Sequence, residues 1–286
     1  MRSEQDSTFR SEVVLVLLDV SVKGDQGRFV PGLRKENFSV FEDGQPQNIT
    51  IFDPEDRPVT VGILLDESRS MTPKRQEVVA AARTLIEESN RMDEIFILHF
   101  NERVSAGLPN GVPFSNNTRE LLVALAREVP GGKTALYDVL WEGLEHLRLG
   151  RRDKKALVLI SDGGDTASRH NRRETAEMVE RSPATIYPIG LYEEGDPDRD
   201  PGFLRWLAKT SGGEIYLPSG PEELAGVCRR VAREIRTRYT IGYIPAVHRR
   251  TGSLRRIRVR VRDPGQRKLT VHTRSGYRYD ERDSLR

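Results

Sequence analysis

Between about residues 58 and 236, apolar strand candidates alternate with amphipathic helix candidates. Residues 59–65 form an apolar run typical of a buried strand, and residues 73–90 follow with apolar side chains at helical spacing. Further strand candidates lie at 95–100, 156–160 and 185–191, and further helix candidates at 135–149, 172–181, 203–209 and 222–236. This alternation predicts an α/β fold, with a doubly wound, mainly parallel sheet covered by helices on both faces.

On either side of this region, apolar residues recur at every second position. Residues 11–53 contain strand candidates, including two short runs around the turn signal Asp43-Gly44. After residue 236 come three more strand candidates, RYTIGYIP, RRIRVRVRD and KLTVHTR. In the second of these, apolar residues alternate with Arg, which predicts a strand with one buried and one solvated face.

Neither flank holds enough strands to fold alone, because two or three strands are marginal without another face to cover them. We therefore expect the N-terminal flank, residues 11–55, to pair with the C-terminal flank, residues 237–280, in one small β-domain. The α/β domain, residues 56–236, would then be inserted between the two halves of the β-domain.

The charge balance and the cysteine count exclude several classes of protein. The chain of 286 residues has 46 Lys and Arg against 43 Asp and Glu. Its net charge of +3 is therefore a small excess, which gives no support to a nucleic-acid partner. The single cysteine, Cys228, excludes an internal disulfide framework and every Cys-cluster zinc site. The five histidines also lack the spacing of a His-based metal site.

The apolar runs are short. The longest unbroken one covers residues 13–18, whereas a helix needs about 18 apolar residues to cross a bilayer. Residues 1–12 are polar and of mixed charge, so the chain as given shows no signal peptide. We expect no membrane span, and these features leave the compartment and the oligomeric state undetermined.

The most informative stretch is LLDESRSM, at residues 64–71, where an apolar strand runs into Asp66, Ser68 and Ser70. Thr72-Pro73 follows as a suitable start for a helix. A carboxylate and two hydroxyls are thus predicted at the carboxyl end of a strand. In open parallel sheets, this edge is where ligands bind.

Two other loops have the same polar character. Thr134 follows two glycines in PGGKT, and Asp162 follows an apolar strand in VLISDGGD. If the loops meet at one edge of the sheet, the set contains only oxygen ligands, without His or Cys. Hard cations such as Mg2+ and Mn2+ prefer oxygen ligands in octahedral geometry. Together the three loops offer an all-oxygen set that suits such a cation: Asp66, Ser68, Ser70, Thr134 and Asp162.

This pattern of Asp-x-Ser-x-Ser, a later Thr and an Asp before Gly resembles the metal-ion-dependent adhesion site of von Willebrand factor A (VWA) domains at all five positions. The resemblance implies a Rossmann-like domain with a complete site. It further implies that Ser68, Ser70 and Thr134 supply hydroxyl ligands, while Asp66 and Asp162 coordinate the ion directly or through water. It also implies that an Asp or Glu side chain of a protein partner fills the open position on the ion.

The resemblance to VWA domains covers about residues 58–236. The flanks, including FVPGLRKENFSVFEDGQPQ and RSGYRY, are similar to a VWFA-related family described mainly from acidobacterial genomes, which extends the resemblance over nearly the whole chain. This second resemblance implies a bacterial, extracytoplasmic protein. One position departs from the pattern, because Arg69 stands where many members have Gly. A cation there would either weaken the affinity for the metal or attract an acidic partner.

We expect a non-enzymatic module that binds a protein partner through a divalent metal. Two alternatives stay open: a metal-assisted hydrolase using the same carboxylates, and a structural scaffold whose site holds no metal. A hydroxyl-rich shell offers no general base at neutral pH, which disfavours the hydrolase. Arg127 stands where a phosphate-binding loop requires Gly, so nucleotide binding is also disfavoured. We expect His99 to pack in the core, and the arginines of residues 255–262 to form a solvated face more readily than a docking stripe.

Overall fold

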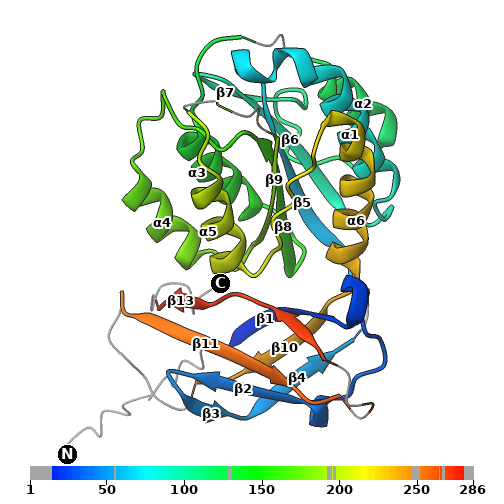
Figure 1. Ribbon diagram of the computed structural model, residues 1–286, viewed down its shortest axis with the longest axis vertical. Helices are drawn as coiled ribbons and strands as arrows, with labels where there is room; N and C mark the ends of the chain where they lie inside the picture. Colours follow the sequence, from blue (N-terminus) through cyan, green and yellow to red (C-terminus); the bar gives the residue numbers. More distant parts are fainter. Residues whose placement is uncertain are drawn as a thin grey trace, which may run out of the picture.

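A computed structural model describes residues 15–54, 56–127, 131–191, 195, 198–245, 252–263, 265 and 268–279. It contains an α/β unit built on a five-stranded sheet and, beside it, two four-stranded sheets (Figure 1). Residues 11–14 and residue 280, with which the predicted flanks begin and end, lie outside the described residues.

The α/β unit is built on a sheet with the strand order β7-β6-β5-β8-β9. Its strands are β5 (Val59–Asp66), β6 (Glu94–Phe100), β7 (Val104–Ala106), β8 (Lys154–Ser161) and β9 (Thr185–Gly190). All neighbours are parallel except β7, which runs antiparallel to β6 at one edge. The prediction of a mainly parallel sheet is thereby confirmed. The chain continues from β5 to β6 on one side and later to β8 on the other, so the switch point of the topology lies at β5 and β8.

Helices cover both faces of this sheet (Figure 1). On one side lie α1 (Arg75–Glu87), α2 (Thr118–Leu125) and α6 (Leu224–Arg236), and on the other lie α3 (Leu136–Leu147), α4 (Arg172–Arg181) and α5 (Pro201–Ser211). Short 3-10 turns occur at Asp25–Gly27, Lys35–Asn37, Arg69–Lys74 and Pro221–Glu223. Within the described residues, no helix is both long and apolar enough to cross a membrane.

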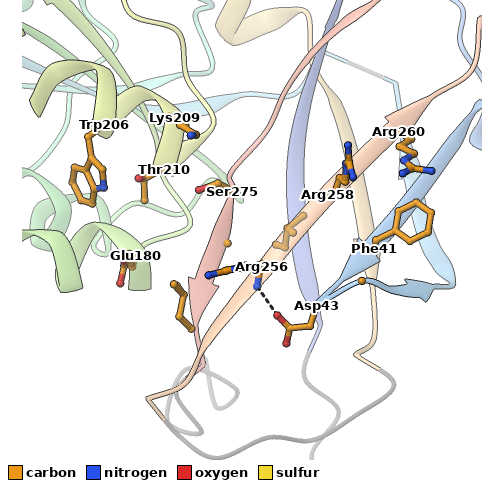
Figure 2. A pocket seen from close by; sticks show the side chains of 14 residues that line it. Phe41, Asp43, Glu180, Trp206, Lys209, Thr210, Arg256, Arg258, Arg260 and Ser275 are labelled. Carbon is orange, nitrogen blue, oxygen red and sulfur yellow. Dashed lines mark hydrogen bonds between the residues drawn. The ribbon is translucent and has the colours of Figure 1, made fainter. Parts of the chain in front are cut away.

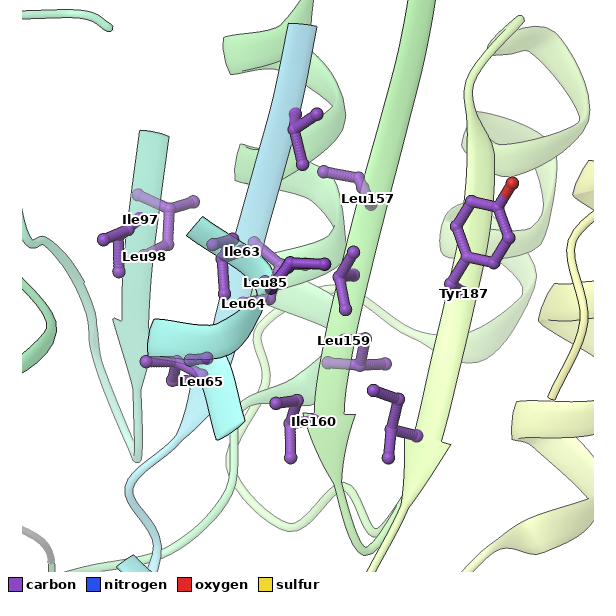
Figure 3. Close-up of a cluster of buried hydrophobic side chains, with 14 of the residues drawn as sticks. Ile63, Leu64, Leu65, Leu85, Ile97, Leu98, Leu157, Leu159, Ile160 and Tyr187 are labelled. Carbon is purple, nitrogen blue, oxygen red and sulfur yellow. The ribbon is translucent and has the colours of Figure 1, made fainter. Parts of the chain in front are cut away.

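The core of the α/β unit lies between the sheet and these helices. Strand β5 is buried along its whole length, as its apolar run predicts. Leu64 and Leu159 on neighbouring strands, and Leu85 on α1, are among the buried side chains of this cluster (Figure 3). The central strands are therefore held rigidly, and their carboxyl ends form a fixed platform for the loops that follow them.

The remaining strands form two sheets with the orders β12-β1-β10-β4 and β13-β11-β2-β3. The strands before the α/β unit are β1 (Val16–Lys23), β2 (Phe38–Glu42), β3 (Gln45–Gln47) and β4 (Ile49–Asp53). Those after it are β10 (Tyr239–Tyr243), β11 (Leu254–Val261), β12 (Thr270–His272) and β13 (Gly276–Arg278). Both sheets combine strands from the two ends of the chain, because β1 pairs with β10 and β2 pairs with β11. One apolar cluster joins the two sheets.

Polar contacts join the β-sheets to the α/β unit. Lys23, at the end of β1, forms ion pairs with Glu214 and with Glu234 of α6, the latter at 2.7 Å. On the other side of the junction, Nε of Arg278 in β13 donates to the Glu180 carboxylate of α4 at 2.6 Å. These contacts lie at the amino-terminal edge of the central sheet, opposite the edge at which the metal ligands are predicted.

Candidate metal centre

Two acidic residues stand at the carboxyl ends of the neighbouring strands β5 and β8. Asp66 is the last residue of β5, and Asp162 directly follows β8. The strands pair in parallel, with Leu65 opposite Ile160, so their carboxyl ends meet at one edge of the sheet. Both carboxylates are buried, with 2% of Asp66 and 3% of Asp162 exposed. The pair therefore lies at the switch point, where open α/β sheets bind ligands.

Hydrogen bonds join four of the five predicted ligands into one cluster. Oδ1 of Asp66 accepts a hydrogen bond from the backbone N–H of Ser68 at 2.9 Å. The hydroxyl oxygens of Ser68 and Ser70 lie 3.1 Å apart, and the Ser70 hydroxyl donates to Oδ2 of Asp162 at 2.5 Å. The 3-10 turn that starts after Ser68 thus brings the Ser70 hydroxyl back to the end of β8.

Thr134 lies on the loop before α3, beside the turn that carries the two serines. The N–H of Arg69 donates to the carbonyl of Gly132 at 3.2 Å, which joins the two loops. Thr166 holds the Thr134 backbone from the other side, through its N–H at 2.8 Å and its hydroxyl at 3.0 Å. In the described structure, no hydrogen bond joins the Thr134 hydroxyl to the other four side chains. Its role as a ligand therefore stays a prediction.

The two carboxylates create an electrostatic cost in the absence of a cation. Burial, and to a smaller extent the negative charge of Asp162, raises the pKa of Asp66 to about 7. Hydrogen bonds from Ser68 and from the Ser161 hydroxyl, the latter at 2.6 Å, lower the pKa of Asp66 but do not offset the increase. A cation held between the carboxylates would stabilise their charged forms.

The donor set fits a hard divalent cation. No group of three or more His, Cys, Asp or Glu side chains in the described part of the chain is arranged to hold a metal. A metal bound there would therefore need the hydroxyl oxygens. With bonds of 2.0–2.1 Å, two ligands at right angles on Mg2+ lie about 2.9 Å apart. The 3.1 Å between the Ser68 and Ser70 oxygens is close to this spacing.

Three further polar residues support the predicted ligands, although the sequence patterns did not single them out. Ser161 donates to Asp66 from the end of β8. Asp165 accepts a hydrogen bond from the backbone N–H of Tyr137, in the first turn of α3, at 3.2 Å, and Thr166 positions the neighbouring loop. The signal that could have identified them is the polar stretch SDGGDT, which follows the apolar strand directly.

His99 lies close to the site but is held in the core, 1% exposed. Its Nδ1 lies 3.0 Å from Oε1 of Glu67, and its Nε2 lies 2.8 Å from the carbonyl oxygen of Ala124. The other oxygen of Glu67 accepts a hydrogen bond from Arg75 at 2.9 Å. Because both ring nitrogens already have partners, His99 has a structural environment and lacks a free nitrogen to act as a general base for a hydrolase.

An open sheet that gathers carboxylates and hydroxyls at its switch point defines an α/β ligand-binding domain. The family model of the von Willebrand factor type A domain matches residues 60–225. The chain belongs to this family, whose domains are modules of protein interaction and adhesion and bind a divalent metal at a metal-ion-dependent adhesion site (MIDAS). A comparison with curated proteins gave no significant match.

Solved structures with the same fold cover different parts of the chain. A von Willebrand factor type A protein from Catenulispora acidiphila has a TM-score of 0.55 at 15% identity, covering 96% of this chain and 77% of its own. The tip protein Mfa5 of Porphyromonas gingivalis type V pili has a TM-score of 0.53 at 13% identity, covering 62% and 95%. Proximal thread matrix protein 1 of the mussel byssus, with a zinc-occupied MIDAS motif, has a TM-score of 0.52 at 18% identity, covering 63% and 48%. This chain thus spans about half the length of the mussel protein.

Proposed function

We propose that this chain is a non-enzymatic module that binds a protein partner through a divalent metal held by Asp66, Ser68, Ser70, Thr134 and Asp162. The observation that carries the proposal is the hydrogen-bonded cluster of four oxygen-bearing side chains at the switch point of the sheet. The zinc-occupied MIDAS of the mussel protein supports it as an example on the same fold. Mg2+ or Mn2+ suits the all-oxygen donor set of this chain best.

The partner group that fits this site is a carboxylate. Five protein ligands leave one of the six octahedral positions of Mg2+ open, and a carboxylate oxygen suits a hard cation at that position. Arg69, which is exposed at the start of the 3-10 turn, adds positive charge beside the site. We therefore assign an Asp or Glu side chain of another protein as the ligand. The resemblance of the flanks to the VWFA-related family supports a second assignment, a bacterial protein that acts outside the cytoplasm.

Calorimetric titration tests the metal site. We expect one Mg2+ or Mn2+ per chain, and a higher melting temperature in its presence, because a ligand at a hundredfold excess over its Kd stabilises the folded state by about 2.7 kcal/mol. Binding should be lost in Asp66→Ala and in the double variant Ser68→Ala/Ser70→Ala. Ser89→Ala is a matched control, since this hydroxyl donates to the Leu85 carbonyl at the end of α1. Unchanged titrations in the first two variants would contradict the assignment.

A pull-down with and without EDTA tests the function. Partner proteins should be retained by the metal-loaded wild-type chain and released by EDTA, and they should not bind to Asp162→Ala. Changing the acidic residue of the partner to its amide should weaken binding sharply, because a neutral amide provides no anionic oxygen. Retention that survives both metal removal and Asp162→Ala would place the interaction elsewhere on the molecule.

A further inference from the structure

A groove of about 1080 Å³ lies between the outer face of the sheet β13-β11-β2-β3 and the helices α4 and α5 (Figure 2). One wall is formed by β11 with Phe41 of β2, and the other by side chains that include Trp206 and Lys209 of α5. The metal centre lies at the carboxyl ends of β5 and β8, whereas this groove lies toward the β-sheets. The two features therefore occupy separate places in the molecule.

A row of three arginines runs along the wall that β11 forms. Arg256, Arg258 and Arg260 occupy alternate positions of β11, and all three side chains are exposed. None of them forms an ion pair within the described residues. Strand β11 pairs with β13 over residues 254–256 and with β2 over residues 257–261, so one neighbour or the other holds its backbone along its whole length. The guanidinium row is thus presented on a rigid surface.

The surroundings of the row add positive charge and apolar area. Lys209 is exposed on the opposite wall. Two acidic residues also line the groove. Glu180 already accepts a hydrogen bond from Arg278 at 2.6 Å, and Asp43 accepts one from the backbone N–H of Arg256 at 3.0 Å. Trp206 and Phe41 are partly exposed toward the groove, and the Arg260 guanidinium lies 5.2 Å from the centre of the Phe41 ring. The groove combines unpaired cations with aromatic faces.

We propose that this groove binds an extended, acidic segment of a partner protein. Alternate residues of an extended chain lie about 6.8 Å apart, so acidic side chains at every second position of a ligand match the repeat of the three arginines. Guanidinium groups bind carboxylates through paired hydrogen bonds. The intervening apolar side chains of the ligand would point to the opposite side of the extended chain, toward Trp206 on the other wall. The side chains of the three arginines are exposed in the groove, so recognition occurs through side chains.

The shape and the charge of the molecule favour this ligand over other polyanions. The cations line a concave groove between two packed units, and a flat membrane surface would not reach its floor. The net charge of the chain is only +3, which is weak support for nucleic acid. The binding surface is also independent of the metal, since none of the candidate metal ligands lines it.

Fluorescence anisotropy with a labelled peptide of alternating Glu and Val tests the proposal. The titration is made in EDTA, so that the metal centre makes no contribution. The result therefore tests the groove alone, whether or not the proposal for the metal centre is correct. We expect saturable binding that weakens at least tenfold in Arg258→Glu, and equally when Gln replaces Glu in the peptide. Arg119→Glu, which reverses an exposed charge on α2, is the matched control and should bind as the wild type does.

Thermal unfolding of each variant shows whether it is folded. The double variant Arg256→Gln/Arg260→Gln provides a second, milder test of the arginine row on β11. Equal affinity of Arg258→Glu and the wild type, or of the Glu and Gln peptides, would overturn the proposal. Heparin and anionic vesicles of phosphatidylserine serve as competing polyanions. Binding of either of these without binding of the acidic peptide would also overturn it, because the groove would then recognise another class of ligand.

Discussion

At the scale of single residues, Asp66 has the most unusual environment in the metal centre. Its pKa rises from 3.8 to about 7, first because it is buried and second because Asp162 is charged. In the unfolded chain, the same carboxyl group ionises near its ordinary pKa. At a pH between the unfolded-state pKa and the folded-state pKa, the folded state holds a proton that the unfolded state has lost. The stability of the metal-free protein therefore falls as the pH rises through this range.

We therefore expect Mg2+ to stabilise the protein more above pH 7 than below it, because the ion binds the ionised carboxylate and displaces the proton. Melting temperatures in EDTA and in Mg2+, at about pH 6 and about pH 8, measure this difference. Asp66→Asn is the matched control, since it keeps the size of the side chain and removes the titration. If wild type and variant have the same pH dependence in EDTA, the titrating group is not Asp66.

A second residue-scale prediction concerns the buried ion pair between Arg255 and Glu42 in the β-sheets. Arg255 is 0% exposed and donates to Oε1 of Glu42 at 2.6 Å. The other carboxylate oxygen accepts hydrogen bonds from the hydroxyls of Tyr243 at 2.7 Å and Tyr277 at 3.0 Å. Glu42→Ala would leave a buried cation and two buried hydroxyls without their acceptor. We expect a loss of about 3–5 kcal/mol in the free energy of unfolding of this unit.

Urea unfolding measures the loss, with Glu87→Ala as the control. Glu87 pairs with Arg83 at 2.7 Å on the exposed surface of α1, and removing such a pair costs about 0.3–0.5 kcal/mol. Similar losses in the two variants would show that the buried pair contributes no more than a surface pair.

These two sites differ in how far sequence could predict them. Asp66, Ser68 and Ser70 are close in sequence, and the ends of parallel strands predict their meeting with Asp162. In contrast, Arg255 and Glu42 are 213 positions apart. Their contact depends on the register of β11 on β2, which places Ile257 opposite Glu42 and leaves Arg255 on the same inner face. The prediction that the arginines of residues 255–262 form a solvated face is wrong for Arg255, because Arg255 shares the buried face of β11 with Ile257. Periodicity predicted neither its burial nor its partner.

At the scale of elements, the regular strands and helices were the most predictable. The helix expected at residues 73–90 instead begins at Arg75, because Pro73 lies in the preceding 3-10 turn. The prediction missed α2, which is only eight residues long, and β7, a three-residue edge strand. Short elements carry too few apolar positions to show a period, and their conformation depends on packing against the rest of the fold.

The central sheet also depends on close contact at a glycine. A Cβ atom at Gly62 in β5 would lie 2.3 Å from Cζ of Phe96 and 2.5 Å from Cδ2 of Leu157. Gly62→Ala should therefore destabilise the α/β unit by about 1–3 kcal/mol, because the buried side chains of Phe96 and Leu157 must shift. Gly226→Ala on α6 is the matched control, where no atom lies within 4 Å, and it should stabilise by about 0.4–1 kcal/mol. Urea unfolding of both variants compares them, and a neutral Gly62→Ala would show that the side chains of Phe96 and Leu157 can repack without cost.

At the scale of the whole molecule, the chain crosses between the two units twice. Strand β4 ends at Asp53 and β5 begins at Val59, while α6 ends at Arg236 and β10 begins at Tyr239. Both crossings are short, and an ion pair between Arg236 and Asp56 at 2.9 Å joins them. The candidate metal ligands and the hydrogen bonds among them lie entirely between the crossings. The inserted unit therefore contains all five candidate metal ligands.

We predict that residues 56–236 fold alone and bind Mg2+ with an affinity within about threefold of that of the whole chain, measured by calorimetry.

Neither flank should fold without the other. Both sheet neighbours of β1, β10 and β12, come from the C-terminal flank, so deleting residues 237–286 leaves β1 with two open edges and an uncovered apolar face. Such a deletion should aggregate in size-exclusion chromatography, as should deletion of residues 1–55. An insoluble fragment 56–236, together with soluble single-flank deletions, would show that this division of the chain is wrong.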